Sequence, residues 1–484
     1  MSNYVASIDF GSAKIALAIG EQSDNGIRIV SYHEAEAVGI SNGEIIKDRQ
    51  VVETVKDLIG KAEEDIQEKI SEVTVGLSGK TLKSKTVSCS KLRSNPDSYI
   101  DEKELSEITR GRYNSDVEYG EAIFDAIPQS YNLDEYLGIS HEDIAGRKGR
   151  QIEASYYLVY GKDSILSRRL EILNACSLKA KKAILSPIAS ARAVLTAQEM
   201  ENGAVLVDIG KGTTEIAIVK DNIVKAVATI PFAGESVTKD IKNVANVTAK
   251  WAEDVKMLHG CCCAEFTPEN KKLILRGQDN MLEGEIELPL LSEVIEARMS
   301  EIFEAVRYIV DQSGYADKLA GGVVLTGGTA YMEYIQQLAK AFMGQKVRLA
   351  APRNSIAYDS VTEAFDAYSS TAVGLVLETI SPMLSYACMN DEPKAASKKQ
   401  DDTLPKIVFE PDEPSETVVE KKAEKDKGED ERERRNRLRE EQKQREREEK
   451  ERIKAQKAQE KEKRKKDKEG GIFSMLFGDN NDKA

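Results

Sequence analysis

Two short glycine-containing turns, far apart in the chain, constrain its fold more than any other feature. The first spans Asp9–Lys14 and the second Asp208–Thr214, and each lies between two apolar segments with the character of strands. A strand–turn–strand unit that begins with aspartate exposes backbone N–H groups in a concave nest, which suits a phosphate chain. One such unit is weak evidence, because Asp-x-Gly begins many ordinary hairpins. Two copies in similar contexts predict two lobes that grip one nucleotide from opposite sides.

The aspartates at the entry of the two turns, Asp9 and Asp208, add a second expectation. Mg²⁺ prefers oxygen ligands, so both carboxylates can hold this cation directly or through its waters. Neither turn leads straight into a predicted helix, which excludes the phosphate loop of the Gly-x-x-x-x-Gly-Lys-Ser/Thr type. The sequence therefore predicts a nucleotide–magnesium site of a different architecture.

The charge of the chain is unevenly distributed. Its 484 residues carry a formal net charge of −14, and this length is typical of several domains. Residues 420–469 hold roughly 22 positive and 17 negative groups, so the part before them is more acidic than the total implies. An acidic body argues against nucleic-acid binding by the folded part. The adjacent cysteines at 261–263 lack the spacing of a disulfide framework or a metal site, so we expect reduced structural thiols.

The apolar periodicity predicts an α/β chain, in which strands and helices alternate. Expected strands lie at 4–33 (three strands, with a turn at Asn25-Gly26), 73–77, 204–209, 215–219, 223–230 and 322–326. Expected helices lie at 51–70, 183–199, 236–247, 251–259, 291–311, 331–342 and 369–380. The pattern changes over 83–162, which contains a polar helix near 101–113 and a strand at 152–160, and we expect a separate insert there.

The composition changes completely after about residue 381. Residues 390–419 are polar and contain prolines, which predicts disorder. The run 420–469 is dominated by Glu, Lys and Arg and cannot fold on a core, although opposite charges at i, i+4 could support a solvated helix. We favour a spacer over a specific binding site for this run.

A short apolar tip follows the charged run and has helical spacing. Its apolar side chains are Ile472, Phe473, Met475, Leu476 and Phe477. Each could contribute ~1.5–3 kcal/mol when fully buried, and less on shallow insertion into an interface. The lysines and arginine at 461–468 add about 1 kcal/mol each near anionic lipid. Together they predict a reversible membrane-targeting helix, against the alternative of a disordered end with chance apolar residues.

The ordered set of motifs resembles the actin-like ATPase superfamily and, within it, the FtsA family of bacterial cell-division proteins. The resemblance covers about residues 4–380. It is carried by both turns and by the segments 186–191, 230–234, 252–261, 293–298, 324–328 and 370–375.

The resemblance implies an α/β, two-lobed actin-like (ribonuclease-H-like) ATPase fold with an inserted 1C subdomain, a charged tether and a C-terminal amphipathic helix. The first-lobe core then comprises 1–82 and 361–388, and the second-lobe core 201–234 and 312–360. The remaining implied parts are the 1C-like insert 83–162, the connecting segment 163–200, the smaller second-lobe subdomain 235–311, the tether 389–469 and the membrane helix 470–479.

The resemblance also implies ATP and Mg²⁺ in a cleft between the lobes. Asp9 and Asp208 would face the metal, and Lys14 would meet phosphate oxygens as a point charge. The residues implied to wrap the phosphates are Gly11, Ser12, Ala13, Gly210, Lys211, Gly212, Thr213 and Thr214. The residues implied to contact the nucleoside are Gly234, Glu253, Lys256, Gly327, Gly328 and Thr329.

Two positions depart from the family pattern. Lys211 stands where glycine is frequent, and it either adds charge at the phosphates or points to solvent. Glu215 stands where aspartate is frequent. No residue is identifiable as a general base for the attacking water, so the catalytic residues are unknown. We therefore expect the nucleotide to act as a conformational and polymerisation switch, with weak or absent hydrolysis.

The implied function is that of a peripheral adaptor at the division site, on the cytoplasmic side of the inner membrane. The implied partners are a second copy of the chain in a filament, the C-terminal tail of the tubulin-like protein FtsZ at Arg298, later division proteins at the insert, and anionic lipids. A solvated helix arginine remains the alternative for Arg298. Competing functions are a rod-shape filament, a pilus-assembly scaffold, and a chaperone or sugar kinase with rapid turnover.

Overall fold

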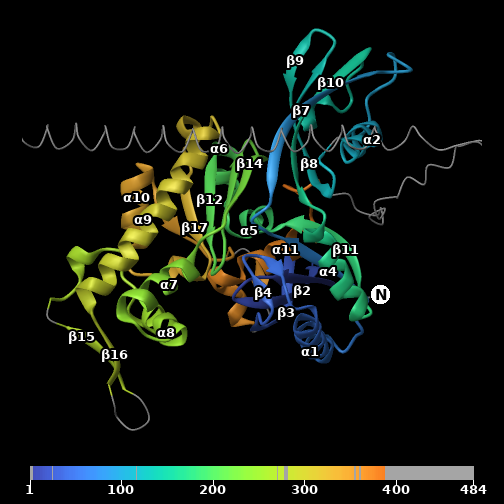
Figure 1. Cartoon of the computed structure of the whole chain (residues 1–484). Coiled ribbons are helices and arrows are strands. Elements are labelled where there is room, and N and C mark those ends of the chain that lie inside the picture. Colours follow the sequence, from blue (N-terminus) through green and yellow to red (C-terminus); the bar gives the residue numbers. More distant parts are fainter. Residues whose placement is uncertain are drawn as a thin grey trace, which may run out of the picture. The chain divides into compact units, whose positions relative to one another are not determined.

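A six-stranded mixed sheet forms the centre of the first lobe, in the order β11-β6-β1-β2-β3-β19 (Figure 1). Its strands are β1 (Val5–Phe10), β2 (Lys14–Ser23), β3 (Gly26–Glu36), β6 (Glu72–Leu77), β11 (Lys179–Leu185) and β19 (Ala357–Tyr358). The first three pair antiparallel, whereas β6 pairs parallel with β1. The computed structural model describes residues 4–23, 26–115, 117–269, 271–276, 282–353, 356–358 and 361–386. The predicted tether and apolar tip lie outside these residues.

The second lobe repeats this pattern in a five-stranded sheet, in the order β14-β13-β12-β17-β18. Its strands are β12 (Ala204–Ile209), β13 (Thr214–Lys220), β14 (Ile223–Ile230), β17 (Gly322–Thr326) and β18 (Val347–Leu349). Again three strands form an antiparallel meander, and β17 pairs parallel with the first of them. Both glycine turns therefore connect the first two strands of a meander, as the sequence predicts.

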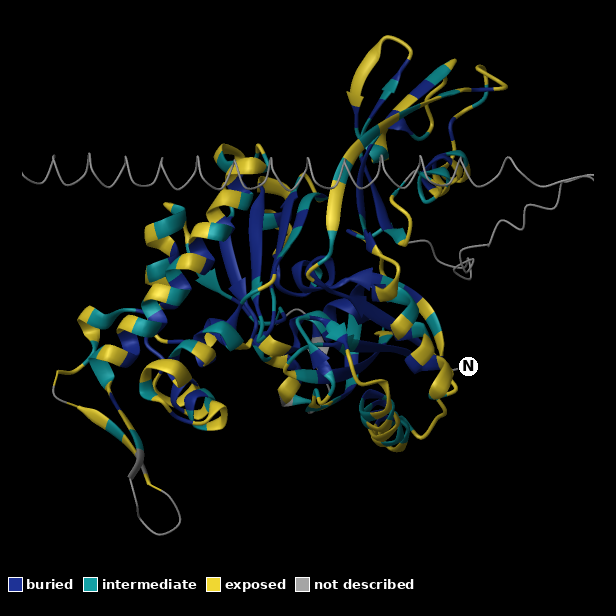
Figure 2. Cartoon of the chain, in the orientation of Figure 1, coloured by how far each residue is buried: buried dark blue, intermediate teal, exposed yellow. Residues whose placement is uncertain are grey.

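Two small-residue helices, α5 (Ser186–Val194) and α11 (Ser370–Ile380), pack against each other between the two sheets. Their backbones approach so closely that a Cβ atom at Gly374 would overlap the carbonyl oxygen of Ala189. The opposite face of the first sheet is covered by α1 (Asp48–Ile66) and α4 (Ser164–Ala175). The opposite face of the second sheet is covered by α9 (Leu288–Gln312) and α10 (Ile335–Met343). The central strands of the two sheets, β1 and β12, are consequently almost wholly buried (Figure 2).

Residues 83–162 form a sheet of their own, in the order β7-β10-β8-β9 (Figure 1). Its elements are β7 (Lys83–Leu92), α2 (Glu102–Arg112), β8 (Glu121–Leu133), β9 (Tyr136–Ile139), α3 (His141–Ile144) and β10 (Gln151–Lys162). Helix α2 begins where the Asp101 side chain accepts a hydrogen bond from the N–H of Glu104. A separate core, in which Tyr131 and Tyr156 are fully buried, holds α2 on this sheet. We call this region the insert.

The remaining elements lie mostly on the outer side of the second lobe. They are β4 (Ile40–Ser41), β5 (Glu44–Ile45), α6 (Ala197–Asn202), α7 (Gly234–Ala245), α8 (Ala249–His259), β15 (Lys272–Arg276) and β16 (Leu282–Glu287), with short 3-10 helices at 264–266, 316–318, 328–331, 362–365 and 367–369. After α8, Cys261 and Cys262 are buried, and the Cys261 thiol donates to the carbonyl of Cys263.

Three sequence expectations need correction. The helix predicted at 183–199 is wrong at its start, because residues 183–185 belong to β11, which pairs parallel with β6. That helix also breaks after Val194, and α6 begins anew at a Thr196–Glu199 capping box. The segment 163–200 thus supplies a strand and a helix to the first lobe instead of serving as a connection alone. The chain also returns to the first sheet at β19, before the expected boundary at 361.

Candidate functional site

The two glycine turns meet at the ends of their sheets. A Cβ atom on Gly212, in the second turn, would lie 2.7 Å from the Ser12 Oγ of the first turn and 3.0 Å from the Asn42 backbone. Only glycine allows this approach. Ser12 Oγ is itself fixed, because it accepts a hydrogen bond of 2.9 Å from the N–H of Gly43. The structure thus brings the predicted phosphate-binding segments of the two lobes together.

The entry aspartates lie beside this contact, each at the end of its strand. Asp208 accepts hydrogen bonds from Ser190 Oγ of α5, at 2.8 Å, and from Thr371 Oγ1 of α11, at 3.5 Å. The two central helices therefore orient Asp208. Asp9 lies close enough to Asp208 for the two charges to repel each other.

The electrostatics of this site disfavour the charged forms of the aspartates. Burial, and then repulsion from Asp208, raise the pKa of Asp9 from 3.8 to about 7. Burial likewise raises the pKa of Asp208 to about 6, although the hydrogen bonds from Ser190 and Thr371 oppose this shift. Burial is the larger cause of both shifts, and the charges of Arg169 and Lys14 partly oppose it at Asp9. A divalent cation between them would offset both the burial and the repulsion.

The sequence analysis did not place two further charged residues in this site. Glu215 is the cross-strand partner of Asp208 in the β12–β13 hairpin, so the two side chains share one face of the sheet. Burial, with repulsion from both aspartates, raises the pKa of Glu215 well above its ordinary value. The predicted β12–β13 hairpin places Glu215 opposite Asp208, so the sequence alone could have placed Glu215 in this site.

The second residue is Arg169 of α4, which is only 1% exposed. Its guanidinium donates to the carbonyl oxygens of Gly43, at 3.1 Å, and Ser78, at 3.2 Å. Its positive charge lowers the pKa of both Asp9 and Glu215, while its own burial lowers the pKa of Arg169 to about 10. Nothing in the local sequence distinguishes Arg169 from the exposed arginines of other helices.

The donor set fits Mg²⁺ in the way this ion usually binds beside nucleotides. Within the described residues, no three His, Cys, Asp or Glu side chains are arranged to hold a metal ion on their own. Mg²⁺ commonly keeps several waters and uses one or two carboxylates together with phosphate oxygens. The carboxylates of Asp9 and Asp208, which lie close enough for their charges to interact, match that arrangement.

Lys14 does not point where the sequence analysis expected. Its ammonium group pairs with the carboxylate of Glu34, donates to the Tyr32 hydroxyl at 2.9 Å, and lies 3.7 Å from the centroid of the Tyr368 ring. Burial lowers the pKa of Lys14, which the Glu34 contact partly opposes. In this structure the charge of Lys14 is therefore directed to these three side chains.

The residues expected at the nucleoside also come together. Lys256 Nζ donates to the carbonyl of Gly234 at 3.1 Å, to Thr238 Oγ1 at 3.0 Å and to Glu253 Oε2 at 2.8 Å. Thr329 Oγ1 donates to the carbonyl of Gly210 at 2.7 Å, which joins this cluster to the second turn.

The glycines of this region permit its close packing. A Cβ atom on Gly327, where φ is +91°, would overlap the Asp208 carboxylate, and Gly328 begins the 3-10 helix that follows. Lys211 is close enough to Glu253 to lower its pKa, so its charge lies toward the nucleoside end.

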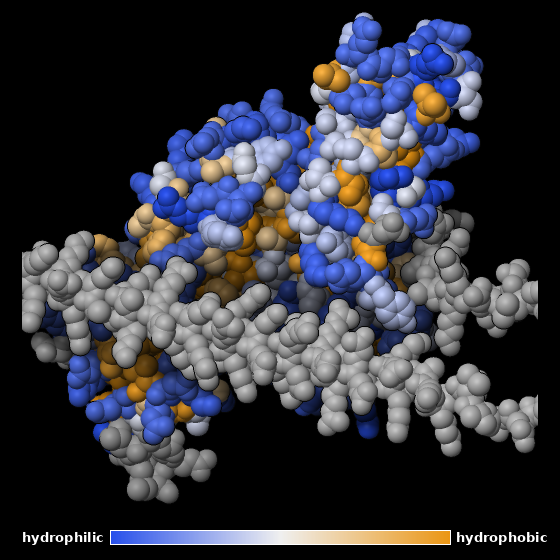
Figure 3. All heavy atoms as spheres, turned by 45° about the horizontal axis from the view of Figure 1, so that its top comes forward, coloured by the Kyte–Doolittle hydropathy of each residue, from blue (hydrophilic) through white to orange (hydrophobic). Residues whose placement is uncertain are grey.

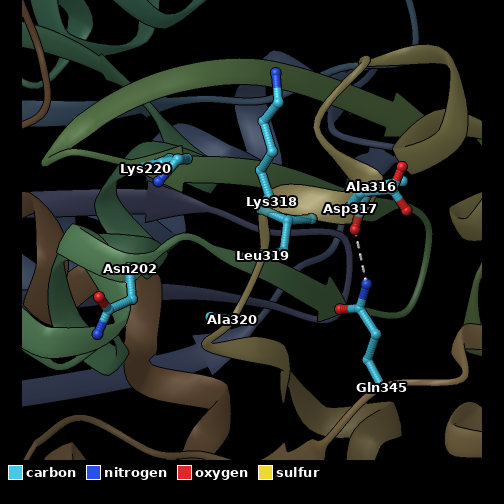
Figure 4. A pocket seen from close by; sticks show the side chains of 8 residues that line it. All are labelled: Asn202, Lys220, Ala316, Asp317, Lys318, Leu319, Ala320 and Gln345. Carbon is cyan, nitrogen blue, oxygen red and sulfur yellow. Dashed lines mark hydrogen bonds between the residues drawn. The ribbon is translucent and has the colours of Figure 1, made fainter.

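Arg298, the expected contact for a partner, lies away from the turns on α9. Its guanidinium forms a two-pronged contact with Asp240 of α7, at 2.6 and 3.2 Å, and also pairs with Glu301. An open pocket of about 510 Å³ lies at the opposite ends of the second-lobe strands, before β12 and β17 (Figure 4). The pocket contains none of the predicted site residues.

The fold matches that of a solved pilus protein. The structure of the PilM–PilN type IV pilus biogenesis complex superposes with a TM-score of 0.56, covering 78% of this chain and 99% of that chain at 15% identity. Its similarity concerns the fold alone. Together with the duplicated sheets and aspartate-bearing turns, it defines the chain as a protein of the two-lobed actin-like ATPase fold.

Comparison with the sequences of known proteins shows which members of this fold class the chain resembles. A family model described as "Cell division protein FtsA" matches residues 205–374. FtsA of Pseudomonas aeruginosa is 26% identical over 400 residues, covering 81% of this chain and 94% of the relative. FtsA of Escherichia coli K12 is 28% identical over 383 residues, covering 77% and 89%. The chain is therefore similar to the FtsA family of cell-division proteins over most of its length.

Proposed function

We propose that this chain is an ATP-binding, actin-like adaptor of cell division, which self-associates and tethers FtsZ filaments to the inner face of the cytoplasmic membrane. In this role it helps to assemble the septal ring and to recruit later division proteins. Similarity to proteins of the FtsA family supports the role in division. The observation that carries the nucleotide part is the meeting of the two glycine turns, with Asp9 and Asp208 beside the contact.

Each part of the site has a distinct role in this proposal. The backbone N–H groups of 11–13 and 211–213 bind the phosphate oxygens. Asp9 and Asp208 hold Mg²⁺, which supplies positive charge to the polyphosphate when bound. Lys256 and Glu253 orient the ribose and base, beside the glycines of the adenosine motif at 327–328.

The arrangement also supports slow hydrolysis. Glu215 is the buried carboxylate nearest in register to Asp208. Burial, with repulsion from both aspartates, raises its pKa and so favours its protonated form. A protonated carboxyl group cannot accept a proton from an attacking water. Nucleotide then serves chiefly to favour one arrangement of the lobes, and with it the filament.

Calorimetry with ATP tests the nucleotide part. We expect the full chain to take up ATP in a Mg²⁺-dependent manner, and Asp208→Asn to weaken this uptake at least tenfold. Asp221→Asn, at the exposed β13–β14 turn, is the matched control and should bind like the wild type. If the folded wild-type chain takes up no ATP with Mg²⁺, the nucleotide part of the proposal is wrong.

Membrane attachment is assigned to the apolar residues at 472–477 and the cationic residues before them. None of the helices in the described ranges has the length and apolarity that a membrane crossing requires. Co-sedimentation with anionic liposomes, comparing the full chain with a chain that ends at Gly471, tests the assignment. We expect only the full chain to pellet and to carry FtsZ with it. Equal pelleting would remove the anchor from the proposal.

Partner binding is assigned to two surfaces. Arg298 pairs with Asp240 on the smaller second-lobe region, where a carboxylate of the FtsZ tail would compete for its guanidinium. Arg298→Ala should weaken binding of an FtsZ tail peptide, whereas Arg307→Ala, on the same helix, should not. The insert is assigned to self-association and later division proteins. Its surface is mostly hydrophilic, with isolated exposed apolar side chains such as Leu92 and Leu137 (Figure 3).

A further inference from the structure

The chain does not leave the first lobe directly after α11. Residues 381–386, which we call the strap, are held first by Glu378 in the last turn of that helix. The Glu378 carboxylate is fully buried and accepts hydrogen bonds of 3.1–3.2 Å from the N–H groups of Met383, Leu384 and Ser385. One buried side chain thus fixes the backbone of most of the strap.

The far end of the strap is held by the insert. Asp125 of β8, also fully buried, accepts hydrogen bonds from Ser385 Oγ at 2.9 Å and from the N–H of Tyr386 at 3.1 Å. The Tyr113 hydroxyl donates to the carbonyl of Tyr386 at 2.8 Å. The Tyr386 ring also meets the edge of His141, with ring centroids 5.6 Å apart. The strap therefore occupies a site on the insert that is built to receive a chain segment.

The middle of the strap joins the core between the insert and the lobes. Leu384 is 1% exposed and belongs to the same apolar cluster as Phe124 and Tyr157 of the insert. On its other side the insert contacts the outer strand of the second lobe. The Tyr157 hydroxyl accepts from the N–H of Val227 at 2.9 Å and donates to its carbonyl at 3.2 Å. The strap thus contacts the insert on one side, and β14 of the second lobe contacts it on another.

We propose that the strap is a latch, which couples the C-terminal tail to the position of the insert. Residues 387–484, which we call the tail, follow Tyr386 directly in the sequence. A force applied to the tail therefore acts first on the hydrogen bonds that Asp125 and Tyr113 form with the strap. Release removes the hydrogen bonds of Ser385 and Tyr386 from the Asp125 carboxylate and leaves it the N–H of Ala126 as a backbone donor. Losing these hydrogen bonds is costly, so the seated strap and the released strap are two distinct states. A released strap also removes Leu384 from the apolar cluster, which loosens the insert from the lobes.

Hydrogen exchange on the full chain tests the seated state. Asp125→Asn keeps the size and shape of the side chain, but its amide group is a poorer hydrogen-bond acceptor for the strap than a carboxylate. Tyr113→Phe removes the hydrogen bond from the tyrosine hydroxyl to the carbonyl of Tyr386. We expect the amides of 383–386 and of the facing part of β8 to exchange about tenfold faster in Asp125→Asn and severalfold faster in Tyr113→Phe. The amides of β12 and β17 should be unchanged.

Asp134→Asn is the matched control, because Asp134 accepts hydrogen bonds from the N–H groups of Arg150 and Gln151 within the insert, away from the strap. It should leave exchange of the strap unchanged. Strap amides that exchange at the wild-type rate in both Asp125→Asn and Tyr113→Phe would overturn the latch.

Single-molecule pulling tests the coupling itself and requires neither nucleotide nor membrane. With one handle at the insert tip, on Tyr136, and the other at Ala484, load passes through the strap. The first release should occur at lower force in Tyr113→Phe than in the wild type, and at the wild-type force in Asp134→Asn. A release force that is the same in all three chains would contradict the proposal.

Discussion

The ammonium group of Lys14 pairs with the carboxylate of Glu34, although Lys14 ends the first glycine turn. The Tyr368 ring covers the same ammonium group at 3.7 Å. To contact a phosphate, the ammonium group of Lys14 would have to leave the carboxylate of Glu34. If the chain binds ATP as proposed, the strength of the Glu34 contact sets how much Lys14 contributes to that binding.

Glu34→Gln should consequently increase the affinity for ATP. A partly exposed ion pair is worth up to about 1 kcal/mol, so we expect a gain of about two- to fivefold. Adenosine has no phosphate and should bind equally to both chains, which separates this effect from a general change of the cleft. Titration calorimetry with both ligands is the measurement, and Glu36→Gln on the same strand is the control. Equal gains for ATP and adenosine would argue against the Lys14 explanation.

The pH dependence of stability should carry the signature of Asp125. Burial raises its pKa from 3.8 to about 7 in the folded chain. The folded state therefore keeps a proton that the unfolded state loses, so the free energy of unfolding falls as the pH rises from about 4 to about 7. The slope from one group is at most about 1.4 kcal/mol per pH unit.

Asp125→Asn should flatten part of that decline, which chemical unfolding at several pH values between 4 and 8 can measure. The slope is informative even if the variant is less stable overall. Asp134 provides the contrast, because the N–H groups of Arg150 and Gln151 lower its pKa. Its stabilising effect is lost only on acidification, so Asp134→Asn should retain the wild-type decline.

Lys256→Ala should weaken adenosine and ATP to a similar extent. The substitution leaves the carboxylate of Glu253 without its closest cation and removes the donor to the Gly234 carbonyl. We expect a loss of about 1–3 kcal/mol in stability and at least tenfold in affinity for both ligands. Lys239→Ala, which removes an exposed pair with Glu235, is the control. A defect with ATP only would place Lys256 at the phosphates instead.

Gly374→Ala should strongly destabilise the chain. The added methyl group would overlap the carbonyl oxygen of Ala189 and force α5 and α11 apart, at a cost of about 3 kcal/mol or more. Gly60→Ala, in the exposed part of α1, meets no atom within 4 Å and should stabilise by about 0.5–1 kcal/mol. Thermal unfolding compares the two. A mild effect of Gly374→Ala would mean that the helices can separate at little cost.

The parts of the structure that were predictable from the sequence are those set by local signals. Alternating apolar residues around an Asp-Gly turn define the β1–β2 and β12–β13 hairpins, and small residues define the contact of α5 with α11. The direction of Lys14 was not predictable, because Glu34 and Tyr368 come from distant segments of the chain. The same holds for Arg169, whose burial depends on Gly43 and Ser78. The helix predicted at 183–199 was wrong at its start, because parallel pairing with the distant strand β6 makes residues 183–185 part of β11.

The contact of the Tyr157 hydroxyl with both backbone groups of Val227 has a consequence for assembly. A strand at the border of a sheet ordinarily invites another chain to extend the ladder. In β14, the Tyr157 hydroxyl is hydrogen-bonded to the N–H and the carbonyl of Val227, which face away from β13. The side-chain amide of Gln129 also donates to the carbonyl of Val224. Extension of the second-lobe sheet by a further strand along β14 is therefore blocked by the protein's own side chains.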